Sequence, residues 1–449
     1  MNFNIPQEVK NILSKFENEN FEIYIVGGAV RDLLTGKIPN DWDFTTNATP
    51  DQILKTLGED AYYDNKFGTV GFPSNSKDLD PFEITTFRTE SGYKDSRHPE
   101  KVEWGKTLEE DLARRDFTIN ALALKQNKNN YEVIDIYNGQ KDLDRKIIKA
   151  VGNPGDRFTE DALRMIRAIR IASQLNFKIE NKTLDAIKSN ANLITKISKE
   201  RIKEELFKIL SSNHSYEGII LLKDSMLLEI ILPEVYKMFG VEQKSPNRHH
   251  IYDVGTHSLM ALKSSTSKDP VTNFAILIHD IGKPQTFKKL ENGTITFYNH
   301  EVAGTKIAFQ IADRLRFSKK ETDKLTKLVR WHQFTVNEFQ TDSAIRRFIK
   351  NVTPEYLDDM LILRTADRVG SGAKLTSWRT EEFKKRLLEV QKQPFSIKDL
   401  KINGTDVMKE LNLKPSKKIG EILESLFKEV EEKKLENTKE DLLKRIKTL

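Results

Sequence analysis

Apolar and polar residues alternate differently in the first third of this chain and in the rest. Residues 21–27, FEIYIVG, form a short apolar run typical of a buried strand, and AVRDLL after it predicts the start of a helix. DWDFTT, GTVGF and FEITTF are short and rich in threonine and aromatic residues, which predicts further strands. We therefore expect a mixed α/β unit at the beginning of the chain.

From about residue 140 the apolar positions follow a helical period. EDALRMIRAIRIASQL places apolar residues at 163, 166, 169 and 172, and NKTLDAIKSNANLITKI and SKERIKEELFKILSS continue the period. EQKSPNRHH, residues 242–250, is polar and contains Pro246, so we place a domain boundary near it. The last stretch, FKEVEEKKLENTKEDLLKRIK, alternates lysine and glutamate and is typical of a solvated amphipathic helix. The pattern predicts an α+β protein with a mixed-sheet head at 1–147, a helical neck and body at 148–245, a second helical domain at 246–370 and a helical C-terminal region at 371–449.

Composition narrows the classes of function. The 449 residues include no cysteine, which excludes disulfides, thiolate ligands and cysteine nucleophiles and fits the cytoplasm. No leader-like segment opens the chain, and no apolar run approaches the roughly 20 residues that span a bilayer, so we expect no membrane association. Residues 141–210 hold 16 lysines and arginines against 10 acidic residues, an excess equal to the net charge of +6 of the whole chain. This concentration favours contact with a phosphate backbone.

Two aspartates lie in one predicted strand. Acidic residues are poor strand formers, but the spacing of Asp41 and Asp43 points both side chains to one face, where they could share a divalent cation. The alternative is an Asx turn at Asp41 and a surface position at Asp43. Glu83, in FEITTFR, adds a third strand carboxylate. Together these residues favour a two-metal site for nucleotidyl transfer, for which Mg²⁺ suits the oxygen ligands.

A Gly-Gly turn precedes the first predicted helix. Gly27 and Gly28 let the backbone approach a ligand, and the amides at the helix start can face a phosphate. By itself such a turn is more often a tight connection. The chain lacks both the G-x-G-x-x-G of dinucleotide folds and a P-loop lysine, so those two nucleotide-binding classes are not favoured.

A predicted helix carries Asp161 and Arg164 three residues apart, and hence on one face. The carboxylate and the guanidinium offer an acceptor and a fork of donors that could hydrogen-bond the Watson–Crick edge of cytosine or adenine. The alternative is a structural salt bridge. Arg167 and Arg170 continue this face, where they would meet phosphate or stack.

The ordered set GGAVRD, DWDFTT, RRDFTINAL at 114–122 and EDALRMIRAIR at 160–170 resembles the motifs of the tRNA nucleotidyltransferases that build the 3′-terminal CCA of tRNA, in the class shared by bacteria and eukaryotes. The resemblance covers roughly residues 20–210. It implies template-independent addition of CCA to tRNA from CTP and ATP, with release of pyrophosphate. It also implies that Asp41 and Asp43 bind catalytic Mg²⁺ with Glu83 as third carboxylate, and that nucleotide is bound by Gly27, Gly28, Arg31, Asp32, Arg115, Asp116, Asn120, Asp161, Arg164, Arg167 and Arg170.

Residues 88–110, RTESGYKDSRHPEKVEWGKTLEE, are polar and contain glycine, which predicts a long mobile loop. The sequence pattern RxExxYxDxRHP resembles the flexible element that members of this family use to change from C to A addition. We therefore favour full CCA addition over CC addition alone.

A second constellation lies in the predicted domain at 246–370. Its members are of metal-ligand type: His257, His279, Asp280, His300, His332 and Asp367. Their order resembles the HD superfamily of metal-dependent phosphohydrolases, which implies a divalent transition metal and hydrolysis of a phosphate ester. FAILI precedes His279 and places the His-Asp pair on a buried helix, where charge needs compensation. For any one buried histidine, the alternative is a satisfied hydrogen bond in the core.

Two rival functions remain. A bacterial poly(A) polymerase shares the head motifs, but its arginine-rich signature after the paired aspartates is replaced here by YYDNKFGTVGF. The other rival is an HD hydrolase with an inactive RNA-binding head, which the intact DxD and EDxxR motifs disfavour.

Overall fold

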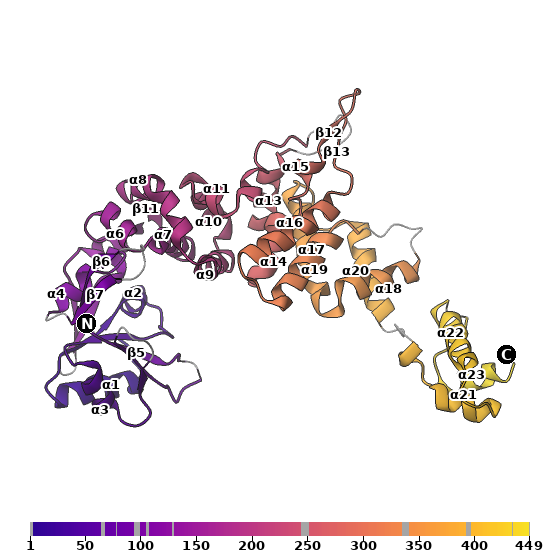
Figure 1. The fold of residues 1–449 in the computed structure, drawn as a ribbon, viewed down its shortest axis with the longest axis horizontal. Coiled ribbons are helices and arrows are strands. Elements are labelled where there is room, and N and C mark those ends of the chain that lie inside the picture. The colour runs from indigo at the N-terminus through magenta and orange to yellow at the C-terminus, as the bar shows by residue number, and fades with distance from the viewer. Residues whose placement is uncertain are drawn as a thin grey trace. The chain divides into compact units, whose positions relative to one another are not determined.

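The computed structural model describes residues 3–63, 68–77, 79–93, 99–104, 107–127, 130–243, 251–334, 341–391, 397–432 and 434–448 (Figure 1). The chain forms two compact units. The first comprises 1–237 with 268–270 and 311–317, and the second comprises 238–267, 271–310 and 318–449. The finer division into four domains, with a boundary at 245/246, stays a prediction.

The first unit begins with a seven-stranded sheet in the order β3-β4-β5-β2-β1-β8-β9. The pair β2·β5 is parallel and the other pairs of neighbours are antiparallel, which confirms the predicted mixed sheet. The strands are β1 (Ile23–Val26), β2 (Asp43–Thr46), β3 (Tyr62–Tyr63), β4 (Thr69–Phe72), β5 (Phe82–Thr86), β8 (Leu122–Asn127) and β9 (Asn130–Asp135).

Alternation along the strands gives the sheet two different faces. One face packs against α1 (Gln7–Asn18), α2 (Gly28–Leu34) and α3 (Pro50–Leu57), with Ile25, Phe44 and Ile84 in the shared core. The other face carries Val26, beside α4 (Leu108–Ala113), and the acidic positions Asp43 and Glu83. The helical layer therefore leaves the acidic positions on the opposite face.

Two local predictions in the head are wrong. The strand with the paired aspartates begins only at Asp43, and Asp41 lies in a bend before it. The predicted long loop contains an antiparallel hairpin of β6 (Arg88–Tyr93) and β7 (Pro99–Trp104). Backbone pairing between two strands does not require an apolar pattern, which explains why the polar sequence did not indicate them. Part of the predicted flexible element, residues 94–98, lies outside the described residues.

After the head the first unit is helical, as predicted. Leu163, Ile166, Ile169 and Ala172 are all buried, which confirms the helical period. The elements are α5 (Gly139–Asp144), α6 (Pro154–Glu160), α7 (Leu163–Leu175), α8 (Asn181–Asn190), α9 (Lys199–Leu210), α10 (Ser215–Asp224), α11 (Leu227–Ile231) and α12 (Pro233–Tyr236), with the two-residue strands β10 (Ile147–Ile148) and β11 (Lys178–Ile179).

The predicted helix across 160–170 is interrupted. Asp161 is extended, at φ −138° and ψ 106°, between α6 and α7. Its carboxylate accepts the backbone N–H of Leu163 at 2.9 Å, so the side chain competes with the helix for backbone donors. Asp161 and Arg164 therefore do not share a helical face.

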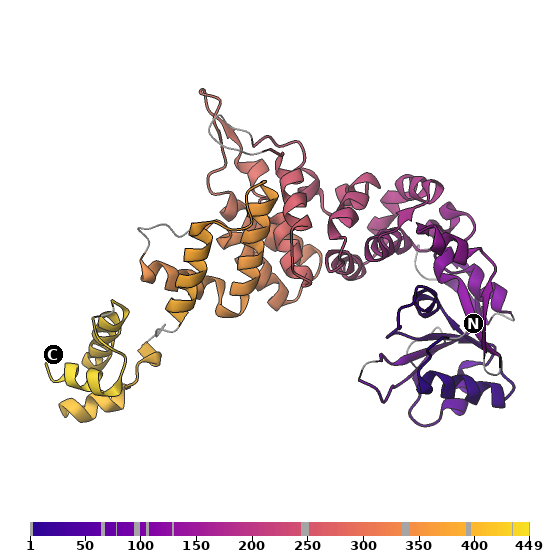
Figure 2. The ribbon, with the colours of Figure 1, turned by 180° about the vertical axis from the view of Figure 1, so that it is seen from behind.

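The described part of the second unit is helical apart from a small hairpin of β12 (Lys288–Lys289) and β13 (Ile295–Thr296), which stands away from its helices (Figure 2). Its helices are α13 (Val254–Lys263), α14 (Pro270–Ile278), α15 (Lys283–Thr286), α16 (His300–Arg314), α17 (Lys319–Trp331), α18 (Asp342–Val352), α19 (Leu357–Gly370), α20 (Trp378–Gln391), α21 (Gly404–Leu411), α22 (Lys417–Glu431) and α23 (Lys439–Ile446). The last three helices enclose an apolar core of their own around Val407, Leu426 and Leu442. The lysine- and glutamate-rich end of the chain is therefore packed rather than one solvated helix. None of the described helices is long and apolar enough to cross a bilayer.

Candidate active site and candidate metal centre

A cavity of about 450 Å³ opens on the acidic face of the head sheet. It collects residues from all four sequence motifs, although these are far apart along the chain. The predicted residues that line it are Gly27, Gly28, Asp43, Glu83, Arg115, Asp116, Asn120, Asp161, Arg164 and Arg167.

Carboxylates crowd one wall of this cavity. Asp43 and Glu83 are paired residues on the parallel strands β2 and β5, so they lie side by side on one face. Burial raises the pKa of Asp43 to about 7, and the carboxylate of Asp41 adds to this shift. Desolvation also raises the pKa of Asp41, with Asp80 as a second cause. A cation beside Asp43 and Glu83 would relieve this desolvation and repulsion, and their oxygen donors fit Mg²⁺, whereas Asp41 is not among the residues that line the cavity.

Gly27 lies where the backbone passes closest to the charged groups. It precedes α2 with φ +74°, in the left-handed region. A Cβ at this position would lie 3.2 Å from Nη1 of Arg115 and 3.3 Å from Oδ2 of Asp43. Both the conformation and the space therefore require glycine.

Two arginines are fixed behind the carboxylates by one fully buried aspartate. Nη2 of Arg114 lies 2.7 Å from Oδ1 of Asp111, and Nη2 of Arg115 lies 3.2 Å from Oδ2. Burial by itself raises the pKa of Asp111, but the two guanidinium groups outweigh it and lower the pKa. The charge of Asp111 thus fixes the direction of both side chains at the cavity.

Asp116 is the centre of a second buried network. Its Oδ2 lies 2.6 Å from Nη2 of Arg167, and its Oδ1 accepts from Nδ2 of Asn120 at 3.2 Å. Asn120 in turn accepts from Arg31 at 2.9 Å, and Arg31 pairs with Asp32 at 2.8 Å. Arg31 and Asp32 therefore lie outside the lining of the cavity and reach it through Asn120.

Asp161 and Arg164 face the same cavity but have different partners. Nη1 of Arg164 donates to Glu160 at 2.7 Å, and its Nη2 donates to the carbonyl of Arg114 at 2.9 Å. Asp161 accepts from Nη2 of Arg201 at 3.0 Å. Within the described part of the chain, Asp161 and Arg164 do not form the direct salt bridge that was the predicted alternative.

The structure places Arg170 differently and adds residues that the motifs did not identify. Arg170 forms an ion pair with Glu205 of α9 at 2.7 Å and does not belong to the lining of the cavity. Arg88, Arg114 and Arg201 do belong to it. Arg114 directly precedes Arg115 in RRDFTINAL and could have been chosen with it. Arg201 lies on a helix that showed only amphipathic periodicity.

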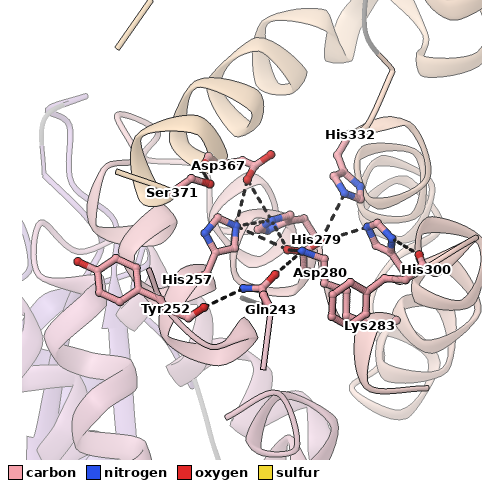
Figure 3. Close-up of polar contacts among 12 residues, drawn as sticks. Gln243, Tyr252, His257, His279, Asp280, Lys283, His300, His332, Asp367 and Ser371 are labelled. Carbon is pink, nitrogen blue, oxygen red and sulfur yellow. Dashed lines mark hydrogen bonds and ion pairs between the residues drawn. The ribbon is translucent and has the colours of Figure 1, made fainter. Parts of the chain in front are cut away.

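The six predicted residues of the second constellation come together in the second unit (Figure 3). His257 lies on α13 and Asp367 on α19, whereas His279 and Asp280 directly follow α14 rather than lying on it. His300 opens α16 and His332 follows α17. Five of the six, all but the partly exposed Asp367, are buried.

The imidazoles present their Nε2 atoms to Asp280 and Asp367. Nδ1 of His279, His300 and His332 lies 2.8, 2.9 and 2.7 Å from backbone carbonyls, so Nδ1 donates to the backbone and Nε2 faces the cluster. Nε2 of His300 and of His332 is buried without a hydrogen-bond partner. Buried lone pairs without a donor are what a cation would satisfy.

Asp280 joins the cluster into two trios. Its Oδ2 lies 3.2 Å from Nε2 of His279, and its Oδ1 lies 3.2 Å from Nε2 of His300. The donor atoms of His257, His279 and Asp280, and those of Asp280, His300 and His332, each lie within 4.8 Å of one another. Mixed imidazole and carboxylate donors fit a divalent transition metal.

The motif did not identify Lys283 and Gln243, which hold Asp280 in place. Nζ of Lys283 lies 2.6 Å from Oδ2 of Asp280 and 2.6 Å from Oε1 of Gln243 (Figure 3). Burial by itself raises the pKa of Asp280, but His279 and Lys283 hold it well below its usual range. Asp280 is therefore ionised at neutral pH and ready to bridge.

The network around Asp116 predicts a pH-dependent loss of stability. Burial raises the pKa of Asp116, but Arg167 outweighs this effect and lowers it from 3.8 to about 2. Because the folded pKa is the lower one, the stabilisation is present above about pH 4 and disappears as the pH falls toward 2. We expect Asp116→Asn to lower the free energy of unfolding by about 2 kcal/mol at pH 7, and by less at each step below pH 4, in urea titrations. Asp185→Asn, at a side chain 73% exposed, is the control and should have no such effect; a loss that is constant with pH would contradict the ion-pair explanation.

Comparison with known families agrees with this geometry. Three family models match the chain: the Poly A polymerase head domain at residues 23–149, an RNA and SrmB-binding site of polymerase A at 176–238, and tRNA nucleotidyltransferase domain 2 at 308–446. Among solved structures, the fold is similar to the Bacillus stearothermophilus CCA-adding enzyme in complex with CTP, with a TM-score of 0.68, 24% identity and coverage of 98% of this chain and 96% of that one. It is also similar to the Thermotoga maritima CCA-adding enzyme complexed with tRNA, with a TM-score of 0.62, 19% identity and coverage of 99% and 96%.

Sequence relatives extend the similarity over the full length. A CCA-adding enzyme of Ligilactobacillus salivarius is 35% identical over 99% of this chain and 98% of its own. A CCA-adding enzyme of Enterococcus faecalis is 32% identical over 98% of this chain and 96% of its own. With relatives this similar over nearly all of both chains, the protein belongs to the family of CCA-adding enzymes and is a nucleotidyltransferase.

Proposed function

We propose that this protein adds C, C and A to the 3′ end of tRNA from CTP and ATP, without a nucleic-acid template and with release of pyrophosphate. The observation that carries the proposal is the single cavity in which Asp43 and Glu83 face Arg115, Asp161 and Arg164. Relatives named as CCA-adding enzymes, and similar structures solved with CTP, ATP and tRNA, support it.

Asp41 and Asp43 would hold Mg²⁺ at the cavity wall, with Glu83 as the third carboxylate. When bound, the ions would acidify the attacking 3′ hydroxyl and balance charge on the triphosphate and the leaving pyrophosphate. Arg115, fixed by Asp111, has its guanidinium beside Gly27, where it would meet the triphosphate. The missing side chain at Gly27 lets the triphosphate approach the backbone.

The base would be selected by Asp161 and Arg164. Cytosine and adenine each present an amino donor beside a ring-nitrogen acceptor, which pairs with a carboxylate and a guanidinium. Uracil and guanine present other patterns and would leave buried groups unpaired, at about 1–3 kcal/mol each. Glu160 and Arg201 hold the two selecting side chains in place before a nucleotide arrives, which reduces the entropy cost of recognition. Arg167 and Arg170, already paired with Asp116 and Glu205, would support this wall.

The excess of positive charge over residues 141–210 favours tRNA contact along α6 to α9, mainly through phosphates. A poly(A) polymerase remains the main rival for the head, and the product length distinguishes the two.

For the second unit we propose a metal-dependent phosphohydrolase centre, made by His257, His279, Asp280, His300, His332 and Asp367. The specific observation that favours it is that the carboxylate of Asp280 belongs to two trios of donor atoms, one with His257 and His279 and one with His300 and His332. A bound transition metal would polarise the phosphate ester and activate water. Lys283 would keep Asp280 ionised and oriented between the two trios.

The main prediction concerns the product of the head. Purified protein given tRNA without its CCA end, Mg²⁺ and each labelled nucleotide should add two C and one A and then stop. Asp41→Ala/Asp43→Ala should abolish incorporation, whereas the exposed Asp60→Ala should not. An open-ended A tail would indicate a poly(A) polymerase, CC alone a partial activity, and no incorporation would move the function to the second unit.

Substitutions at two glycines distinguish the effect of steric crowding from the effect of backbone strain. Gly27 and Gly36 both have φ +74°, but a Cβ at Gly36 would meet nothing within 4 Å. We expect Gly27→Ala to lower kcat/KM for CTP on the order of 10- to 100-fold, because the methyl group displaces Arg115 and Asp43. Gly36→Ala should retain the wild-type kcat/KM. Equal losses in both variants would mean that strain, and not the close approach, decides the effect.

If the cluster in the second unit binds metal, the bound metal can be removed without loss of CCA addition by the head. Asp280→Asn should remove the transition metal that survives desalting, measured by mass spectrometry of the elements, because both trios lose their shared ligand. CCA addition should persist in that variant. His214→Gln, at a partly exposed histidine of the first unit, should leave the metal content unchanged. Undiminished metal in Asp280→Asn would exclude the cluster as the metal site, and bound metal without phosphate-ester hydrolysis would indicate a structural ion.

A further inference from the structure

A cavity of about 470 Å³ lies directly beside the metal centre, bounded by α19, α20 and the segment between them. It shares the lining residues His332 and Asp367 with the cavity at the centre, so the two cavities adjoin. Its other polar walls carry three guanidinium groups, those of Arg364, Arg368 and Arg379. Against them stands one lining carboxylate, that of Asp367, so this cavity favours an anion.

One face of α19 connects the ligand to the cations. Arg364, Asp367 and Arg368 stand at positions i, i+3 and i+4, which point in the same direction on a helix. Ser371, one turn further along the chain, lines both this cavity and the cavity that contains the metal centre. Asp367 and the two guanidinium groups therefore line the same cavity from one helix.

Arg364 has the features of a group prepared for a ligand. Its guanidinium stacks at 4.9 Å on the ring of Phe383, and its Nη1 is buried without a hydrogen-bond partner. Burial lowers its pKa to about 10, so the group remains charged at neutral pH. A buried cationic N–H without an acceptor is costly, and an anion in the cavity would supply the acceptor.

The other two guanidinium groups are held at the edge of the same cavity. Nε of Arg368 donates to the carbonyl of Lys374 at 2.7 Å, and Arg379 stacks on Trp378 at 5.3 Å. Their forks are therefore oriented in advance, which favours recognition of a phosphate with its several oxygens.

We propose that this cavity binds a second anionic group of the substrate hydrolysed at the metal centre, so that the substrate class is a phosphate ester with a further phosphate, such as a nucleoside bisphosphate. The inference rests on the proposed phosphohydrolase function. Water would add to the phosphorus at the centre, the ester P–O bond would break, and the leaving oxygen would take up the proton. The second phosphate would stay intact on Arg364, Arg368 and Arg379.

The test compares adenosine 3′,5′-bisphosphate with adenosine 3′-monophosphate as substrates of the full chain loaded with Mn²⁺. Arg364→Gln should raise KM for the bisphosphate about 10-fold or more and leave KM for the monophosphate unchanged. Arg379→Gln, at an exposed position, should raise it less, and Arg347→Gln, at an exposed position on α18, is the matched control. Equal changes for both substrates would overturn the inference.

Binding separates this inference from the proposed hydrolysis. Adenosine 3′,5′-bisphosphate is titrated calorimetrically into Asp280→Asn and into Asp280→Asn/Arg364→Gln, in which any binding at the head is the same. Weaker binding in the double variant supports the anion cavity even if the wild type hydrolyses neither substrate, in which case only the phosphohydrolase proposal fails. Identical binding in the two variants overturns the inference whatever the hydrolysis shows.

Discussion

Compensation of buried carboxylates is the constraint on which the head depends. Burial and the neighbouring carboxylate of Asp41 both raise the pKa of Asp43. Guanidinium groups compensate this negative charge, but their own positions must be fixed. Asp111 and Asp116, both buried, fix Arg115 and Arg167 through ion pairs of 3.2 and 2.6 Å. The cavity is therefore one electrostatic network, and its geometry is set before any nucleotide binds.

The same constraint shapes the second unit with a different set of side chains. Asp280 is buried among imidazoles, and Lys283 supplies the fixed positive charge beside it. Backbone carbonyls hold three of the four imidazoles through Nδ1, so their remaining nitrogens converge. In both units, groups outside the cavity orient the lining side chains through hydrogen bonds and ion pairs. The atoms that face the cavity are then left for a ligand.

The site in the head was predictable to the extent that its residues lie in short, ordered motifs. Asp43 and Glu83 were identified because acidic residues are unusual in strands, and Arg115 was identified because RRDFTINAL resembles a family motif. Arg201 was not, because it lies on an ordinary amphipathic helix and joins the cavity only through the packing of α9 against α7. Asp161 was identified for its chemistry but placed wrongly, since periodicity cannot show that its carboxylate would take the N–H of Leu163 and end the helix.

By itself, the sequence determined the mixed α/β class of the head, the helical nature of the remainder and most residues of the two candidate sites, because periodicity and local motifs report on neighbours along the chain. Only the tertiary structure decided which of these residues meet. In it, the polar segment that begins at Arg88 pairs as a hairpin, Arg170 forms an ion pair with Glu205, and Arg364 lies in one cavity with Asp367 and against the ring of Phe383. These contacts depend on backbone pairing and on side-chain direction between distant segments, which no local pattern encodes.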